Sequence, residues 1–464
     1  MLDPDQNDAD VLVVGAGLAG LTAARRLEQA GHDALVVEAR DRVGGRTLSA
    51  PIPGADPDDP AAVLDLGAGW VGPTQDRVLA LIGELGLATF PTYDDGDNLA
   101  EHRGALRRYP GGIPRLGLPA LADLGQAQLR LDRMARTVPV DAPWTAARAE
   151  AWDRTTFAGW IQRNLRTRTG REVMQILAEA VWAAHPAELS LLHVLFYMRA
   201  GGGLDALANV RGGAQQDRVV GGTQGIALAG AAALRREPVL DAPVRAVGWA
   251  PDRVTLSLRG GRTLAGRRAV LALAPHLLAP VRFEPPLPPL RHQLHQRMPP
   301  GTVIKCYAVY PAPFWRDAGL SGQAADPTGP VKVTFDASPP DGSPGVLLGF
   351  VEGRQARELG ALTAPARRQA VLDCFTRYFG PAAGRPTGFV ERAWAAEEYS
   401  GGCYAGYFGP GGWTGYGSVL RPPVGPLHFA GTETATAWFG YLDGAVRSGE
   451  AAAAAVGAEL QPGP

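Results

Sequence analysis

The chain has 464 residues, with 45 lysines and arginines against 46 aspartates and glutamates, a formal net charge of −1 and 46% hydrophobic residues. The near-zero charge excludes the basic footprint of a nucleic-acid-binding protein, and the apolar fraction excludes a disordered chain. The length predicts two domains or one large intertwined pair.

The cysteines and the chain ends indicate the compartment. Cys306, Cys374 and Cys403 are too few and too scattered for a disulfide framework or a zinc site, so we predict no metal and a reducing, cytoplasmic compartment. The opening MLDPDQNDAD lacks the basic and apolar regions of a signal peptide. The closing AAAAAVGAELQPGP is too short and too small-sided for a membrane span, so we expect no membrane partner.

The first predicted elements form a βαβ unit in VLVVGAGLAGLTAARRL and the following LVVEA. An apolar strand, residues 11–14, runs into Gly15, Gly17 and Gly20 and then into an Ala-rich helix. Gly15 permits the tight turn, Gly17 leaves room for a pyrophosphate, and Gly20 lets the helix pack on the strand. Glu38 closes the second strand and can accept hydrogen bonds from ribose hydroxyls. The spacing therefore predicts a bound adenine dinucleotide, with its phosphates at the helix N-terminus.

The next segments alternate between mixed and helical patterns. VLDLGAGWVGPTQ reads as a short strand and a Gly-rich turn, followed by an amphipathic helix through DRVLALIGELG. Residues 90–210 read as helical, with EVMQILAEAVWAAH and ELSLLHVLFYMRA as the clearest stretches. Strand patterns return at DRVVGG and PVRAVGWA. RVTLSLRGGRTLAGRRAVLALAP predicts a hairpin with a GG turn, and the Pro-rich FEPPLPPL predicts a linker.

The last third predicts further strands and two helices. GTVIKCYAVY is a strand that carries Lys305, one of only two lysines in the chain, and VKVTFDA and GVLLGFVEG are strands as well. ARRQAVLDCFTRYFG reads as a helix. SGGCYAGYFGPGG is a second Gly-rich cluster. PLHFAGTETATAWFGYLDGAVRSGEAAAAAV then reads as a strand, a turn and a long Ala-rich helix that begins near Tyr441.

Five of these blocks together point to a family. VVEARDRVGGRT, LDLGAGWVGPTQ, GTVIKCYAVY, SGGCYAGYF and HFAGTETATAWFGYLDGAV resemble the FAD-dependent monoamine oxidases and occur in that family's order along nearly the whole chain. The resemblance implies FAD as the cofactor. It also implies an α/β fold in which a Rossmann-like FAD-binding domain of discontinuous segments joins an α+β substrate domain. We expect the FAD-binding domain at 1–88, 213–284 and 391–464, and the substrate domain at 89–212 and 285–390.

The resemblance also assigns cofactor contacts. It places Arg46 near the pyrophosphate or the flavin edge, the turn at residues 67–70 beside the isoalloxazine, and Val244 at the adenine end. Ordinary roles stay open for Arg46 as a surface residue and for Val244 as strand core. The turn at residues 431–433 and the following helix N-terminus would stabilise charge on the reduced flavin. The full predicted set is Gly15, Ala16, Gly17, Gly20, Glu38, Ala39, Arg40, Gly45, Arg46, Gly67, Ala68, Gly69, Trp70, Val244, Cys403, Gly431, Thr432, Glu433 and Leu442.

Four residues carry the implied chemistry. Tyr404 and Tyr441 match two tyrosines that form an aromatic cage before the flavin, Lys305 matches a lysine that reaches flavin N5 through a water, and Trp394 matches a tryptophan beside the flavin. The plainer alternatives are core tyrosines, a lysine at an exposed strand edge and a core tryptophan. Cys403 matches the cysteine that forms a thioether to FAD in animal monoamine oxidases, so covalent FAD and an unlinked thiol both stay open.

Two positions bear on substrate choice. Ala200 stands where the animal enzymes carry a glutamine that lines the active site, and His193 lies in an apolar helix expected to line the entrance cavity. We expect His193 to influence specificity rather than act as a base.

The leading function is oxidation of a small primary amine, with an arylalkyl side chain favoured, to an imine that hydrolyses to aldehyde and ammonia while O2 becomes H2O2. The partners are then the amine and O2, and a homodimer stays open. An L-amino-acid oxidase, a polyamine or putrescine oxidase, an FAD-dependent dehydrogenase or desaturase of an apolar substrate, and a non-catalytic flavoprotein remain alternatives.

Overall fold

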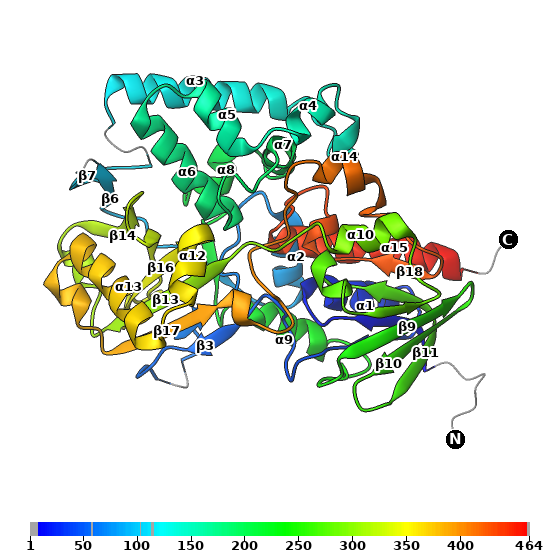
Figure 1. The fold of residues 1–464 in the computed structure, drawn as a ribbon. Helices are drawn as coiled ribbons and strands as arrows, with labels where there is room; N and C mark the ends of the chain where they lie inside the picture. Colours follow the sequence, from blue (N-terminus) through cyan, green and yellow to red (C-terminus); the bar gives the residue numbers. More distant parts are fainter. Residues whose placement is uncertain (1–7, 57–58, 103, 113–115, 462–464) are drawn as a thin grey trace.

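The computed structural model describes residues 8–56, 59–102, 104–112 and 116–461. Figure 1 shows a group of helices at one end of the molecule and two separate sheets below it. The sequence prediction about a signal peptide concerns a segment that lies mostly outside the described residues. None of the described helices is long and apolar enough to cross a membrane.

The first sheet contains the predicted βαβ unit. Its parallel strands are buried on both faces, which explains their unbroken apolar sequence. In spatial order it comprises β12 (Arg282–Glu284), β9 (Val244–Ala250), β10 (Arg253–Leu258), β11 (Thr263–Leu271), β1 (Ala9–Val14) and β2 (Ala34–Val37), and β18 (Leu427–Phe429) pairs with β11. β10 and β11 form the predicted antiparallel hairpin, while β1 pairs in parallel with both β11 and β2. The helices α1 (Leu18–Gln29) and α15 (Leu442–Leu460) pack against each other beside this sheet.

The second sheet lies at the other side of the molecule in Figure 1. In spatial order it comprises β17 (Gly388–Ala393), β13 (Val303–Tyr310), β16 (Gly345–Glu352), β15 (Val331–Asp336), β14 (Leu320–Ala325), β6 (Asp97–His102) and β7 (Ala105–Tyr109). All pairs are antiparallel except β14 with β6. β13, which carries Lys305, is an inner strand and is buried along its whole length.

The helical group covers residues 118–208. It comprises α3 (Leu118–Ala135), α4 (Ala149–Asp153), α5 (Phe157–Asn164), α6 (Arg168–Trp182), α7 (Leu191–Ala200) and α8 (Leu204–Ala208). The expectation of a helical section from residue 90 is wrong at its start. Three strands, β5 (Thr89–Pro91), β6 and β7, precede α3, which is the first helix of that section. β6 pairs with β14, more than 200 residues away, and local periodicity carries no sign of such a partner.

The remaining elements connect these parts. They are β3 (Ser49–Pro51), β4 (Val63–Asp65), α2 (Asp76–Glu84), β8 (Asp217–Val219), α9 (Gln224–Ala232), α10 (Pro289–His295), α11 (Phe314–Asp317), α12 (Gly353–Gly360), α13 (Ala364–Phe379) and α14 (Gly412–Tyr416). The predictions of β4, α2, α13, β18 and α15 are confirmed. The Pro-rich segment predicted as a linker includes the end of β12 and the start of α10.

Each sheet draws its strands from separate parts of the chain. The first sheet uses residues 9–37, 244–284 and 427–429, and the second uses 97–109, 303–352 and 388–393. The fold is therefore α/β with a second α+β part, as predicted. The boundary predicted at residue 390 falls inside β17, and the domain limits as a set stay a prediction.

Candidate active site

A cavity of about 720 Å³ runs from the first sheet to the second. At one end it is bordered by the last residues of three parallel strands, namely Val14 of β1, Val37 of β2 and Leu271 of β11. Side chains of β13, β15 and β16 border the other end. The carboxyl ends of parallel strands are where open α/β sheets bind ligands.

The glycine turn after β1 has the shape that a pyrophosphate requires. Gly15 has φ +101°, and a Cβ there would lie 2.8 Å from the Ala272 carbonyl oxygen. A Cβ on Gly20 would lie 1.9 Å from the Gly15 carbonyl oxygen, so the helix and the turn can approach this closely only because Gly20 has no side chain. At Gly17 a Cβ would meet nothing nearer than 3.9 Å, and no side chain caps α1, so its first N–H groups are left for a ligand.

Glu38 is held at the cavity by the backbone. Its Oε2 accepts a 2.8 Å hydrogen bond from the Ala16 N–H, and its Oε1 accepts one of 3.0 Å from the Arg40 N–H. The side chain is buried and borders the cavity, so the remaining lone pairs can receive hydroxyl groups. This turn, the uncapped helix and the fixed acid together fit an adenine dinucleotide.

Arg46 and Glu433 form a bidentate ion pair with N–O distances of 2.6 and 2.9 Å. Arg46 also donates to the Tyr404 carbonyl oxygen at 3.0 Å, and Glu433 accepts from the Gly406 N–H at 3.0 Å. Burial alone would raise the pKa of Glu433, but Arg46 and the N–H donors hold it below its ordinary value. Glu433 thus supports Arg46 from behind rather than bordering the cavity.

The turn at residues 67–70 forms part of the cavity wall. A Cβ on Gly67 would lie 2.2 Å from the Arg46 carbonyl oxygen, so only glycine allows this approach. The Trp70 ring lies 5.1 Å from that of Phe335 and 5.9 Å from that of Phe350. Trp394 is buried and donates from Nε1 to the Leu66 carbonyl oxygen at 2.8 Å.

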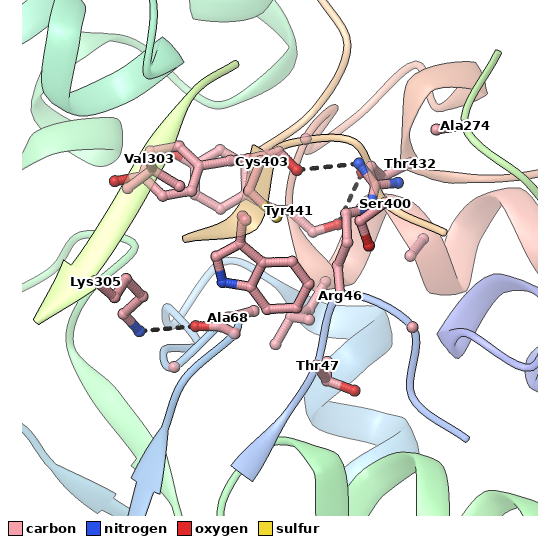
Figure 2. Close-up of a pocket in the computed structure, with 18 of the residues that line it drawn as sticks. Arg46, Thr47, Ala68, Ala274, Val303, Lys305, Ser400, Cys403, Thr432 and Tyr441 are labelled. Carbon is pink, nitrogen blue, oxygen red and sulfur yellow. Dashed lines mark hydrogen bonds between the residues drawn. The ribbon is translucent and has the colours of Figure 1, made fainter. Parts of the chain in front are cut away.

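Lys305 is buried, with 3% of its surface exposed, so the alternative of an exposed lysine at a strand edge is wrong. Its Nζ donates to the carbonyl oxygens of Asp65 and, at 2.7 Å, of Gly67. Figure 2 shows it reaching from β13 towards the turn that holds Ala68. Burial lowers the pKa of Lys305 to about 7, although the nearby Asp65 carboxylate opposes the shift. Near neutral pH the amine is therefore protonated in part of the molecules and neutral in the rest.

The two predicted cage tyrosines border the same cavity from different segments. The Tyr404 hydroxyl donates a 2.6 Å hydrogen bond to Oε1 of Glu352, and its ring meets Phe350 edge-on at 6.3 Å. Tyr441 precedes α15, and its ring lies 6.0 Å from that of Tyr197 and 5.0 Å from that of Trp438. Each phenol is thus fixed by neighbours that the sequence reading did not single out.

Cys403 lies beside Tyr404 at the cavity, where Figure 2 shows it with Arg46, Tyr441 and Thr432. Burial raises the pKa of its thiol to about 12, against the pull of the Arg46 guanidinium.

Most of the predicted residues border this cavity. They are Gly15, Gly17, Glu38, Ala39, Arg40, Gly45, Arg46, Gly67, Ala68, Gly69, Trp70, Val244, Lys305, Trp394, Cys403, Tyr404, Gly431, Thr432, Tyr441 and Leu442. Ala16, Gly20 and Glu433 stand behind the wall and shape it through the contacts described above. The structure brings the set together, and the individual roles stay proposals.

His193 and Ala200 do not border the cavity, so that expectation is corrected. α7 is buried on nearly every side, and from it only Tyr197 reaches the cavity among the described residues. The His193 ring instead packs among aromatic rings, 5.6 Å from Phe439 and 6.2 Å from Trp413. Burial lowers its pKa to about 3. A uniformly apolar helix gives no periodicity from which its cavity side could be read.

Sequence reasoning missed Glu352, Tyr197, Phe335 and Phe350, all of which border the cavity. Glu352 had a readable signal, because an acid that ends the otherwise apolar strand GVLLGFVE calls for a partner. The aromatic residues gave no such signal, since they look the same as core residues.

Comparison with known proteins agrees with this site. Residues 18–457 match the family described as flavin containing amine oxidoreductase. AofH of Mycobacterium tuberculosis, assigned by name to the flavin-containing monoamine oxidases, is 46% identical over 97% of each chain. Cyclohexylamine oxidase from Brevibacterium oxydans superposes with a TM-score of 0.93 at 35% identity, over 98% of this chain and all of that one. Putrescine oxidase bound to putrescine superposes with 0.92 at 34%, over 97% and 99%.

The match covers nearly the whole chain, and the glycine turn, Glu38 and the uncapped helix fit the dinucleotide that such proteins carry. The chain therefore belongs to the flavin-containing amine oxidoreductases and is an FAD-dependent amine oxidase.

Proposed function

We propose that this enzyme oxidises a small primary amine with an arylalkyl side chain to an imine, which water hydrolyses to an aldehyde and ammonia, while O2 is reduced to H2O2. The observation that carries the proposal is the wall of the cavity beyond Tyr404 and Tyr441. It is formed by aromatic and aliphatic side chains from three elements and a loop, namely Trp70, Val173, Ile176, Leu177, Val181, Val333, Phe335 and Phe350. An apolar side chain of the substrate would be buried there.

Bound FAD supplies the two-electron acceptor. The residues of the chain then have to place the α-carbon of the amine and control its charge. Tyr404 and Tyr441 would flank the amino group, and the apolar wall disfavours the ammonium form, so the reactive neutral amine is favoured. Trp394 and Lys305 would complete the wall at the reacting end, and the N-terminus of α15 would stabilise negative charge on the reduced cofactor.

An L-amino-acid oxidase needs a cation for the substrate carboxylate. The arginines among the described lining residues are Arg40, Arg46, Arg245 and Arg259, and all four come from the first-sheet part of the chain. The lining on the second-sheet side offers no arginine among the described residues; it offers His102 and Lys305, and the Nζ of Lys305 already donates to two carbonyl oxygens. This distribution favours an amine without a carboxylate.

A diamine oxidase needs an acid for the distal ammonium. On the substrate side the lining acids are Glu101, Glu172 and Glu352. Glu172 accepts from Arg168, Glu101 accepts from the Gly104 N–H, and Glu352 accepts from Tyr404. Glu101 and Glu172 already have partners, and burial raises the pKa of Glu352 to about 8, which disfavours the charged carboxylate that a distal ammonium needs. We therefore place diamines second, although putrescine oxidase is a close structural relative.

The test is anaerobic mixing of the purified FAD-loaded enzyme with benzylamine, phenethylamine, putrescine and phenylalanine, followed through flavin absorbance. We expect rapid bleaching with the first two. Bleaching by putrescine alone would identify a diamine oxidase, and bleaching by phenylalanine alone would identify an amino-acid oxidase. No bleaching with any amine would overturn the proposal in favour of a dehydrogenase or a non-catalytic flavoprotein.

We further propose that Cys403 links FAD covalently through a thioether to the 8α carbon; the thiol and the 8α carbon would each lose a hydrogen, and the two electrons would pass to the flavin and then to O2, which becomes H2O2. The position of Cys403 at the cavity beside Tyr404 supports this link, whereas the raised pKa of the thiol opposes it until the thiolate is stabilised. Acid precipitation tests the link, because yellow colour stays in the pellet only if the cofactor is bonded. Cys403→Ser, which removes the thiol, is the matched control.

The cytoplasm is the proposed compartment, supported by three cysteines that are all free and buried. The five domain segments predicted from the sequence and a homodimer remain proposals as well. Light scattering of the FAD-loaded protein tests the dimer, and limited proteolysis tests the segment limits.

A further inference from the structure

A buried carboxyl group stands directly behind the proposed cage. Glu352 is the last residue of β16, opposite Val303 of β13, and none of its surface is exposed. Its Oε1 accepts the 2.6 Å hydrogen bond of the Tyr404 hydroxyl, and its Oε2 has no hydrogen-bond partner among the described residues. A buried carboxyl with an unpartnered oxygen costs free energy, so its presence needs a reason beyond packing.

Two more buried ionisable side chains act electrostatically on Glu352. Lys332 of β15 and Glu179 of α6 are each 1% exposed, and Nζ lies 3.9 Å from Oε2 of Glu179. Lys332 also donates to the Pro327 carbonyl oxygen at 2.9 Å. Two acids and one base are thus buried together, and only one of the acids can be neutralised by the base.

The surroundings of Glu352 favour its protonated form. Burial raises the pKa of Glu352 to about 8; the Tyr404 hydroxyl and Lys332 oppose the shift, and Glu179 adds to it. At neutral pH the carboxyl is therefore mostly protonated, and its carbonyl oxygen still accepts from Tyr404. Above this pKa a negative charge develops directly beneath the phenol.

The Tyr404 ring has two fixed contacts on this side. Phe350, two residues before Glu352 on the same strand, meets the ring edge-on, and Glu352 holds the hydroxyl. An edge contact alone leaves the ring free to tilt, whereas a hydrogen bond at the far end of the ring fixes its direction.

We propose that Glu352 is a positioning residue for amine oxidation, which orients the Tyr404 ring against the substrate by accepting its hydroxyl hydrogen bond. The proposal rests on the proposed function, in which Tyr404 flanks the amine. Glu179 of α6 and Lys332 of β15 act on this carboxyl through their charges. Substrate recognition by Tyr404 thereby depends on an ionisable group that the amine itself need not touch.

The test compares Glu352→Gln, Glu352→Leu and Tyr404→Phe, with Glu358→Gln on the exposed side of α12 as the control. The rate of flavin reduction by benzylamine is measured anaerobically on FAD-loaded protein. Glu352→Gln retains a carbonyl acceptor and should keep the wild-type rate, as should the control. Glu352→Leu and Tyr404→Phe should each slow reduction about tenfold, as expected for one lost hydrogen bond in the transition state.

The double variant with Glu352→Leu and Tyr404→Phe separates positioning from a general structural defect. If the two residues act through one hydrogen bond, the double variant is no slower than either single one. Wild-type reduction should also change with a pKa near 8 that Glu352→Gln lacks. Multiplied losses, or a Glu352→Leu enzyme as fast as wild type, would overturn the proposal.

Crystal structures of the FAD-loaded wild type, Glu352→Gln and Glu352→Leu give a readout that does not depend on the substrate. The Tyr404 ring should keep its orientation with glutamine and turn with leucine. An unmoved ring in Glu352→Leu would contradict the positioning role, even if no amine reduces the flavin and the proposed function has failed. If Glu352→Leu does not fold, crystal structures of Glu352→Gln and Tyr404→Phe are compared instead. The side-chain carbonyl oxygen of residue 352 should keep its place in Glu352→Gln, which retains the tyrosine hydroxyl, and should move in Tyr404→Phe, which lacks it.

Discussion

Arg46 and Glu433, 387 positions apart, meet in a two-pronged ion pair at the wall of the cavity. Arg46 belongs to the segment after the βαβ unit and Glu433 to the turn before α15. The pair therefore ties the first and last parts of the chain together at the place where the cofactor is expected.

Arg46→Ala should destabilise the protein by about 3 kcal/mol, because it leaves the fully buried Glu433 carboxylate without its cation. Thermal unfolding and the FAD content after gel filtration measure the effect. Arg354→Ala, which breaks an exposed pair with Glu358, is the control and should change stability by less than about 0.5 kcal/mol. Equal losses of stability in the two variants would show that the buried ion pair contributes no more to stability than the exposed one.

The same pair makes a pH prediction. The pKa of Glu433 is lower in the folded protein than its ordinary value of 4.5, so its stabilising contribution is complete above pH 4.5 and disappears as pH falls through the folded pKa. Without Arg46 the carboxyl takes up a proton at higher pH. Arg46→Ala should therefore release FAD at a higher pH than wild type in an acid titration followed by flavin fluorescence.

Lys305→Met should make the free energy of unfolding depend less on pH between about 7 and 10.5. The pKa of Lys305 is about 7 when folded and 10.5 when unfolded, so burial of the protonated amine opposes folding fully below pH 7 and ceases to do so above 10.5. The variant should exceed wild type in thermal midpoint most at pH 6–7, and the gap should close towards pH 10.5. A gap that stays constant with pH would contradict the lowered pKa. Turnover should fall in the same variant if Lys305 takes part in the reaction.

Gly20→Ala should abolish FAD binding, because a Cβ there would lie 1.9 Å from the Gly15 carbonyl oxygen and force the phosphate turn apart. Flavin absorbance of the purified variant is the measurement. Gly230→Ala in α9 is the matched control: a Cβ at this position meets nothing within 4 Å, and the change should stabilise the helix by about 1 kcal/mol. A yellow Gly20→Ala protein would refute the close approach of helix and turn.

His193→Leu should leave amine preference unchanged. The ring is buried among aromatic residues away from the cavity, and neither ring nitrogen has a partner among the described residues. The ratio of kcat/KM for benzylamine to that for phenethylamine should stay within about twofold, below the roughly tenfold effect of a lost pocket contact. A changed ratio would restore the specificity role that the sequence suggested.

The dinucleotide part of the site could be predicted because local sequence determines it. Gly15, Gly17, Gly20 and Glu38 lie within one βαβ unit, and their spacing alone fixes turn, helix start and acid. Lys305 was visible for another reason, since a charged residue inside an apolar strand of a lysine-poor chain is conspicuous. Tyr404 and Tyr441 came from family resemblance, because nothing in their local pattern separates a cage from a core.

The other half of the site depends on contacts between distant segments. Glu352 meets Tyr404 across 52 positions, and Glu179 reaches Lys332 from a helix onto a sheet. His193 was misplaced because an apolar helix that is buried all round has no polar side to set its rotation. β6 was missed because its partner strand follows much later in the chain.

The burial of both lysines has a chemical consequence for the proposed release of an aldehyde. Aldehydes condense with unprotonated ε-amines, whereas guanidinium groups stay protonated and do not form Schiff bases. Lys305 and Lys332 are 3% and 1% exposed, so the outer surface of the described residues presents arginine and no exposed lysine. Condensation of an aldehyde with a lysine would then be confined to Lys305, which borders the cavity where the aldehyde would form.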